Sequence, residues 1–180
     1  MFKKNLPKTL WMIFKFLSKN FYISFSIVTL IYFLDRLSKI FVTQLDKNNF
    51  GLDIFNSSYL NIVLIWNKGI AFGLFSFNET HLYNILSLII SMIVAVLVII
   101  SFKSKGFKRY SLLMIVGGAL GNLHDRIFYN AVPDFIDFHV GNFHWFIFNV
   151  SDIFISLGVI SMIVLELADN KTKKNNDKKY

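Results

Sequence analysis

The chain has 180 residues, of which 54% are hydrophobic, 17% aromatic and only 17% charged, and its mean hydropathy is +0.52. A soluble domain usually carries about 25% charged residues, so this composition excludes a soluble, disordered, collagen-like or coiled-coil protein. The chain contains no Cys, which excludes disulfides, a thiolate nucleophile and Cys-ligated zinc or iron–sulfur clusters. These features indicate a small integral membrane protein.

The basic residues predict how the chain crosses the membrane. Fourteen of the 19 lie in three segments, residues 1–20, residues 103–109 and the tail after Leu167. These segments flank apolar runs, as cytoplasmic loops do in membrane proteins, whereas nucleic-acid binding would need the charges on one folded face. We therefore expect no nucleic-acid partner and place the three segments on the cytoplasmic side.

Four apolar segments are predicted to span the bilayer as helices. Only the second is a wholly uncharged run long enough to cross a hydrocarbon core of about 30 Å; each of the others carries polar residues at one end. Tyr59–Trp66 is rich in strand-forming residues and favours a short antiparallel sheet on the outer surface. The expected spans are residues 22–42, 82–102, 108–127 and 150–168, and the expected outer segments are residues 44–79 and 128–149.

The predicted organisation is one four-helix domain, residues 22–168, in a mainly α membrane protein with both termini cytoplasmic. A basic juxtamembrane extension (residues 1–21) precedes this domain, and a basic cytoplasmic tail (residues 169–180) follows it. Lys15 breaks the apolar run of the extension, and no small-residue cleavage site follows. We therefore expect the extension to remain uncleaved.

The polar ends of three predicted spans all fall on the outer side of the membrane. Ionisable side chains in membrane-spanning segments point into the bundle interior or into water, and they usually mark a functional site. Their convergence therefore predicts a polar functional site at the outer face. Its candidate members are Asp35, Arg36 and Lys39 from the first span, Asn122, Asp125 and Arg126 from the third, and Asn149 and Asp152 from the fourth.

Asp134 and Asp152 are candidate catalytic carboxylates, because the loop between them is long enough to bring them together. Two carboxylates in contact share one proton near neutral pH. The ionised one can then take a proton from water while the protonated one donates to a peptide carbonyl, as in aspartic proteases. In the alternative reading, Asp152 caps a helix and Asp134 occupies a turn; the spacing leaves both open.

Other polar residues also have structural alternatives. Asp35 and Lys39, at i and i+4, are typical of a helix-supporting ion pair, and Asn122, Asp125 and Arg126 would equally form an ion network that closes a helix. A small ion- or proton-coupled transporter also carries intramembrane Asp and Arg, but a conduction path needs ionisable groups at several depths. A non-enzymatic assembly subunit would use the charged pairs for packing alone.

His124, His139 and His144, with Asp137, are candidate zinc ligands on the outer face. Their spacing matches no helical ligand pair such as H-E-x-x-H. We therefore interpret the three histidines as surface residues at the membrane boundary and expect no metal in the site.

Five ordered sequence blocks carry a resemblance to a known family. In this order they resemble the blocks of lipoprotein signal peptidase, the bacterial signal peptidase II family, over about residues 30–165. The blocks are LDRLSK (34–39), NKGIAFG (67–73), GGALGNLHDR (117–126), VPDFIDF (132–138) and FNVSD (148–152).

The resemblance implies an intramembrane aspartyl endopeptidase of the bacterial inner (cytoplasmic) membrane, with its site near the extracytoplasmic face beside a small β-cradle and with no cofactor. The implied reaction is cleavage of diacylglyceryl-modified prolipoproteins just before the lipidated cysteine. The implied partners are these substrates, membrane lipids and globomycin-type inhibitors, and we expect a monomer. The implied catalytic pair is Asp134 and Asp152, and the implied supporting residues are Asn67, Asn122, Arg126, Asn149, Asp35, Lys39 and Asp125.

Overall fold

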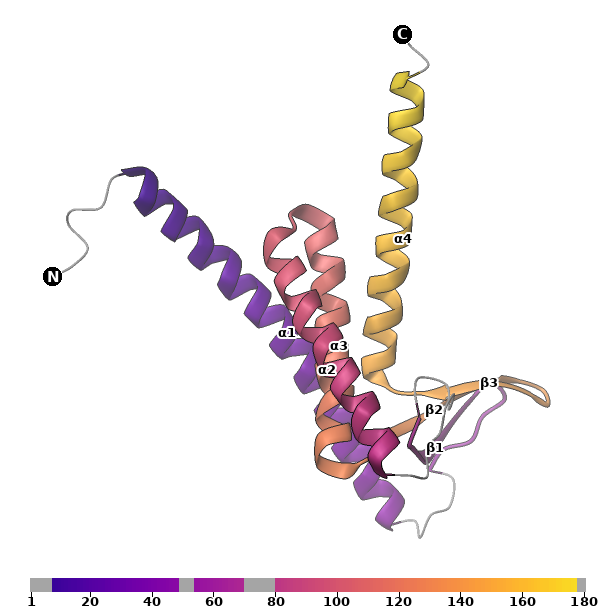
Figure 1. The fold of residues 1–180 in the computed structure, drawn as a ribbon. Coiled ribbons are helices and arrows are strands. Elements are labelled where there is room, and N and C mark those ends of the chain that lie inside the picture. The colour runs from indigo at the N-terminus through magenta and orange to yellow at the C-terminus, as the bar shows by residue number, and fades with distance from the viewer. Residues whose placement is uncertain (1–7, 49–53, 70–79, 178–180) are drawn as a thin grey trace, which may run out of the picture.

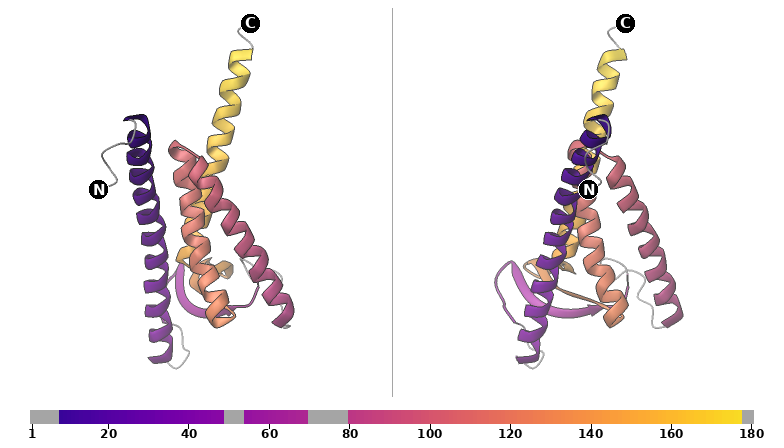
Figure 2. Two further views of the ribbon diagram at one scale, coloured as in Figure 1. Left: turned by 60° about the vertical axis from the view of Figure 1, so that its left-hand side comes forward. Right: turned by 90° about the vertical axis from the view of Figure 1, so that its left-hand side faces the viewer.

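The computed structural model describes residues 8–48, 54–69 and 80–177, which form four helices and three strands. The helices make an open bundle with the sheet at one end, while the first residues of α1, the α2–α3 connection and the last residues of α4 lie at the other end (Figures 1 and 2). The elements are α1 (Lys8–Asn48), β1 (Leu60–Asn67), α2 (Thr80–Lys103), α3 (Gly106–Tyr129), β2 (Val132–Val140), β3 (Phe143–Phe148) and α4 (Val150–Asp177).

The four helices contain the residues of the four predicted spans, and α1 and α4 are much longer than predicted. α2 and α3 extend one or two residues beyond the predicted limits at each end. α1 already begins at Lys8, because no Pro or Gly interrupts the sequence from there to Asn48. α4 likewise continues past the predicted end at residue 168 to Asp177 through a segment without Pro. Hydropathy identifies the apolar part of a helix. The helix itself can continue through polar residues as long as no helix-breaking residue such as Pro interrupts it.

The apolar side chains lie mainly on the outside of the bundle. Among the described residues, Tyr83–Lys103 in α2 and Val150–Asn170 in α4 are long and apolar enough to cross a membrane, and only 11% of the most apolar stretch of each is buried. The fully buried side chains, in contrast, include Asp35, Asp125 and Asn149. A polar interior inside an apolar exterior is the arrangement expected of a helical protein whose surface faces lipid.

Glycines in α3 let the helices approach closely around this polar interior. α3 packs against α1, α2 and α4. A Cβ on Gly117 would lie 2.9 Å from the Cβ of Ile31 in α1, and a Cβ on Gly121 would lie 2.6 Å from the carboxylate of Asp35 and collide with the hydroxyl of Ser151. Only glycine permits these approaches without displacing a neighbour, so α1 and the start of α4 meet at α3.

The sheet is antiparallel with the strand order β1-β2-β3. The strand predicted at Tyr59–Trp66 is confirmed as β1, shifted by one residue. The other two strands come from residues 128–149, an expected outer segment in which we predicted a loop between Asp134 and Asp152. Asp134 therefore lies in the central strand, opposite Ile65 of β1, and its interpretation as a turn residue is wrong. Strand pairing between distant segments supplies the hydrogen bonds that a loop would lack.

Candidate active site

Asp134 and Asp152 line one cavity of about 440 Å³ at the sheet end of the bundle. β2 carries Asp134, and the first turn of α4 carries Asp152. Asn67 of β1 also lines this cavity, together with Asn122 and Arg126 of α3. The structure thus brings the two predicted catalytic residues, from separate elements, into one space; together we call them the dyad.

Asn149 joins the two aspartates of the dyad. Its side-chain Nδ2 donates a hydrogen bond to Oδ1 of Asp134 at 2.6 Å. Its backbone N–H donates to Oδ2 of Asp152 at 3.1 Å, and its own Oδ1 accepts from the backbone N–H of Asp152 at 3.1 Å. The last two bonds form a reciprocal cap at the start of α4. Asp152 is therefore a helix-capping residue and a cavity residue at once, so the two readings of its role are compatible.

Two further asparagines complete the support of the dyad. Asn67 Nδ2 donates to Oδ2 of Asp134 at 2.9 Å, and Asn122 Nδ2 donates to Oδ1 of Asp152 at 2.8 Å. With Asn149, amide N–H groups contact all four carboxylate oxygens. Among the described residues, no Lys or Arg forms an ion pair with either aspartate. Neutral amides orient a carboxylate without the strong preference for ionisation that a contacting cation imposes.

The environment of Asp134 favours its protonated form. Burial, followed by the nearby charge of Asp152, raises the pKa of Asp134 to about 6. The hydrogen bonds from Asn67 and Asn149 and the charge of Lys39 act in the opposite direction but do not offset the increase. A carboxyl group with this pKa holds or releases a proton near neutral pH, which suits acid–base chemistry.

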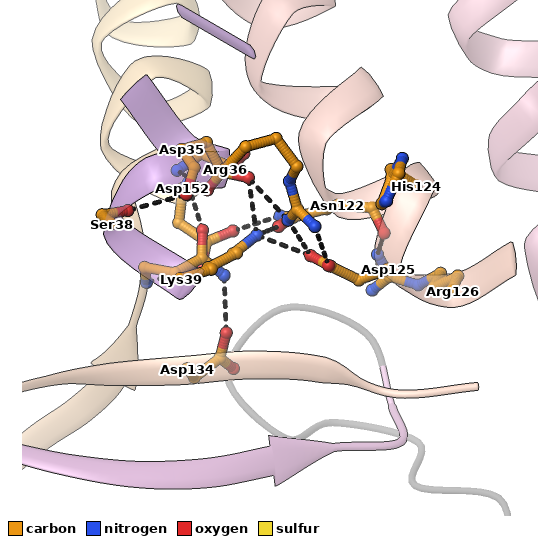
Figure 3. Close-up of polar contacts among 12 residues, drawn as sticks. Asp35, Arg36, Ser38, Lys39, Asn122, His124, Asp125, Arg126, Asp134 and Asp152 are labelled. Carbon is orange, nitrogen blue, oxygen red and sulfur yellow. Dashed lines mark hydrogen bonds and ion pairs between the residues drawn. The ribbon is translucent and has the colours of Figure 1, made fainter. Parts of the chain in front are cut away.

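Asp35, Arg36, Lys39 and Asp125 form a buried group beside the dyad, which we call the ion cluster. Figure 3 shows the Arg36 and Lys39 side chains of α1 directed toward Asp125 and Asn122 of α3, with Asp35 beside them. Asp125 contacts Arg36 at 2.6 Å and Lys39 at 2.7 Å, and Asp35 contacts the same two residues at 3.0 and 2.9 Å. Two acids and two bases leave no formal net charge, which allows their burial. Arg36, which was absent from the predicted supporting residues, is an integral member; its position beside Asp35 in an apolar helix was the available signal.

The ion cluster contacts the surroundings of the dyad at two points. Lys39 Nζ donates to Oδ1 of Asn122 at 2.8 Å, which directs the Nδ2 of that asparagine toward Asp152. Oδ1 of Asp35 accepts from the backbone N–H of Ser151 at 3.0 Å, which holds the first turn of α4. In the part of the chain that the structure describes, Asp35 and Lys39 therefore make no direct hydrogen bond to the dyad and contact it through Asn122 and Ser151.

Arg126 lines the cavity but stands apart from the ion cluster. Asp125 and Arg126 are neighbours in a helix and so point in different directions. Nη1 of Arg126 donates to the backbone carbonyl of Asn122 at 3.2 Å, and Nη2 donates to that of Gly69 at 3.1 Å. Arg126 thus fastens the segment that follows β1 to α3. The rest of the NKGIAFG block, residues 70–73, lies outside the described residues.

The structure brings together three of the four candidate zinc ligands. Asp137, His139 and His144 lie close to one another on β2 and β3, whereas His124 is in α3, where its Nδ1 hydrogen-bonds the Tyr32 hydroxyl at 2.8 Å. The interpretation as surface residues is wrong for His139, which is buried. A comparison with helical ligand spacings could not find the group, because its members lie on paired strands.

Two partly desolvated aspartates in a cavity at one end of an apolar-surfaced helical bundle fit the class of membrane aspartic peptidases. Residues 27–168 match the family described as signal peptidase (SPase) II, Peptidase_A8. The chain belongs to this signal peptidase II family of aspartic peptidases, which confirms the resemblance carried by the five blocks.

Individual proteins agree with this assignment. The chain is 45% identical over 160 residues to a lipoprotein signal peptidase of Pelagibacter ubique (strain HTCC1062), covering 89% of this chain and 96% of that protein. It is 42% identical over 137 residues to a lipoprotein signal peptidase of Anaplasma phagocytophilum (strain HZ), covering 74% and 85%. Two solved structures described as bacterial membrane enzymes match with TM-scores of 0.68 and 0.66 at 28% and 29% identity. These matches cover 84% and 82% of this chain, and 91% and 94% of the solved chains.

Proposed function

We propose that the chain removes signal peptides from diacylglyceryl-modified prolipoproteins by cutting just before the lipidated cysteine, with Asp134 and Asp152 as the catalytic pair. The observation that carries this proposal is the cavity that both carboxylates line. The name of the relatives, lipoprotein signal peptidase, supports prolipoproteins as the substrates.

The proposed reaction is a direct attack of water on the peptide carbonyl. One aspartate is ionised and takes a proton from the water while the water oxygen bonds to the carbonyl carbon. The other aspartate is protonated and donates its proton to the carbonyl oxygen. The tetrahedral intermediate then collapses, the C–N bond breaks, and the leaving nitrogen receives the proton taken from water. The intermediate's hydroxyl returns its proton to the second carboxylate, so the pair again shares one proton.

Two cavities that share Asp152 support an apolar substrate. Apart from its polar end, the dyad cavity is walled by aliphatic side chains such as Ile90, Ile155 and Val159. A second cavity of about 360 Å³ is lined by aromatic residues of β2 and β3 and shares Asp152 and Ser156 with the first. An endopeptidase needs room on both sides of the cut bond, and apolar walls suit a signal peptide or acyl chains.

The proposed orientation places the site near the extracytoplasmic face and both termini in the cytoplasm. The sheet and the start of α4, the elements that carry the dyad, lie at the opposite end of the bundle from the start of α1 and the end of α4 (Figure 2). Those two ends, together with the α2–α3 connection, carry most of the Lys and Arg residues. Basic residues near span ends favour the cytoplasmic side.

Purified protein is expected to cut a lipidated prolipoprotein just before the modified cysteine. The same substrate without the lipid is expected to show at least about 100-fold lower kcat/KM. This ratio corresponds to about 2.8 kcal/mol, and each buried CH₂ group contributes about 0.8 kcal/mol. Mass spectrometry of both products locates the cut. Equal turnover of the two substrates, or cleavage at another bond, would contradict the proposal.

The pH dependence of kcat/KM reports the shared proton. We expect activity to fall on the alkaline side, with an apparent pKa at or above about 6, because the dyad must keep one proton and Asp134 has a raised pKa. Asn67→Ala removes a hydrogen bond that lowers the pKa of Asp134, so its alkaline limb is expected at higher pH. Asn84→Ala, at an exposed site on α2, is the matched control. If the apparent pKa of the alkaline fall in kcat/KM is the same in Asn67→Ala as in the wild type, the result would argue against Asp134 as part of the pair.

A further inference from the structure

Three metal-binding side chains converge on the sheet outside the dyad cavity. Asp137 and His139 are two residues apart on β2, and His139 is the register partner of His144 on β3. Residues two apart on a strand share a face, and opposite residues on paired strands are neighbours. One ligand atom from each of the three residues lies within 4.8 Å of the others.

Contacts within this group hold the side chains near one another. Nδ1 of His144 lies 2.8 Å from Oδ2 of Asp137. The rings of His139 and His144 stack with centroids 4.9 Å apart and an interplanar angle of 17°. Asn61 of β1 donates to Oδ2 of Asp137 at 3.3 Å. Metal-ligating carboxylates are commonly supported by such a neighbouring hydrogen bond.

His139 provides an independent observation. It is 9% exposed, and its Nδ1 has no hydrogen-bond partner among the described residues. A buried nitrogen without a partner has lost its hydrogen bonds to water without replacement, and a coordinate bond from this nitrogen to a metal ion would satisfy it. The His144 side chain is 54% exposed, so the group is open to an ion from solution.

We propose that Asp137, His139 and His144 form a binding site for a divalent transition-metal ion of the zinc class. Two imidazoles and one carboxylate suit Zn²⁺, whereas Mg²⁺ and Ca²⁺ prefer oxygen ligands alone. Bonds of about 2.0–2.1 Å in a tetrahedral site place ligand atoms about 3.3 Å apart. The ligand atoms now lie within 4.8 Å of one another, so binding requires side-chain rotation that shortens the longest separation by up to about 1.5 Å. Water takes the remaining position.

The bound ion would join two strands that support the dyad. β2 carries Asp134, and β3 leads directly into Asn149 and Asp152. Asp134 lies three residues before Asp137, so the alternation of side chains directs it to the other face of the sheet. The ion therefore stabilises the hairpin and takes no part in peptide hydrolysis, which makes this inference independent of the proposed function.

The test is a titration of the full chain, purified in detergent through a tag that contains no histidine, with Co²⁺ as a spectroscopic probe. We expect saturation at one Co²⁺ per chain, visible absorption bands of a four- or five-coordinate ion, and displacement by Zn²⁺. Zn²⁺ is also expected to raise the thermal unfolding midpoint, because it binds only the folded chain. Absence of saturable binding would overturn the proposal.

Three variants locate the ion. Each variant is expected to raise the Kd for Co²⁺ by more than about 100-fold: Asp137→Asn, His139→Gln and His144→Gln. Loss of a residue that only hydrogen-bonds a metal ligand already lowers metal affinity by about 10–100-fold, and loss of the ligand itself is expected to cost more. His124→Gln, in α3, is the control and is expected to bind as the wild type does. His144 is exposed, so its variant is expected to fold normally, as checked by its unfolding midpoint without metal. Unchanged binding in the folded His144→Gln variant would overturn the site.

Discussion

Asp134→Asn and Asp152→Asn are each expected to lower kcat by about 10³-fold or more, toward the upper part of the range that general acid–base catalysis contributes. Asparagine keeps the size of aspartate but cannot hold or transfer the shared proton. The measurement is cleavage of a lipidated prolipoprotein at saturating substrate by purified variants. Asparagine also has only one acceptor oxygen, whereas Asp134 accepts from both Asn67 and Asn149, so the unfolding midpoint of each variant is measured in parallel.

The double variant separates a cooperating pair from two independent contributors. Residues that act as a unit show strongly non-additive effects, so Asp134→Asn with Asp152→Asn is expected to be no more than a few-fold less active than the worse single variant. Asp169→Asn is the matched control, because it makes the same change at an exposed position near the other end of α4. Normal turnover in either folded single variant would remove that residue from the catalytic pair.

Lys39→Met is expected to destabilise the protein by about 3–5 kcal/mol, the usual cost of removing one partner from a buried ion pair. Lys39 is 2% exposed and contacts both Asp35 and Asp125. Its loss leaves two buried carboxylates with only Arg36 as a cation, and it removes the donor to Oδ1 of Asn122. Reversible denaturant unfolding in detergent micelles measures the change in the free energy of unfolding.

A second substitution tests whether charge balance is the cause. Adding Asp125→Asn to Lys39→Met restores one acid and one base in the ion cluster, so the double variant is expected to be less destabilised than the sum of the two single variants. Coupling between contacting residues is typically about 0.5–3 kcal/mol. Lys47→Met, at an exposed position of α1, is the control and is expected within about 0.5 kcal/mol of wild type. Strict additivity would exclude charge balance as the cause.

Local features of the sequence were enough to predict the helices and the end of the bundle at which the polar residues gather. The uncharged run in α2 exceeds the thickness of a bilayer core, and the polar residues of the other spans sit at ends that the alternation of spans brings together. β1 was also predictable, since strand-forming residues are concentrated in a short run. These properties depend on neighbours in the chain.

The candidate site was predictable only through the order of its motifs. Spacing left Asp152 with two roles, and the structure shows that its capping bonds to Asn149 leave its other oxygen for Asn122 in the dyad cavity. The strands β2 and β3 were missed because Asp134, Asp137 and the histidines interrupt the apolar pattern of this segment. The pairing of β2 with β1 on one side and with β3 on the other, which local sequence does not show, makes them strands.

Hydropathy and charge act through local length and composition, so the amino-acid sequence was enough to predict a membrane-embedded helical chain with acidic and amide side chains gathered at one end. Only packing shows that Asn149 bridges the two aspartates, that Arg36 and Lys39 each pair with both Asp35 and Asp125, and that Asp137 meets His139 and His144. Each of these depends on contacts that form when separate helices and strands pack, and no spacing along the chain encodes them.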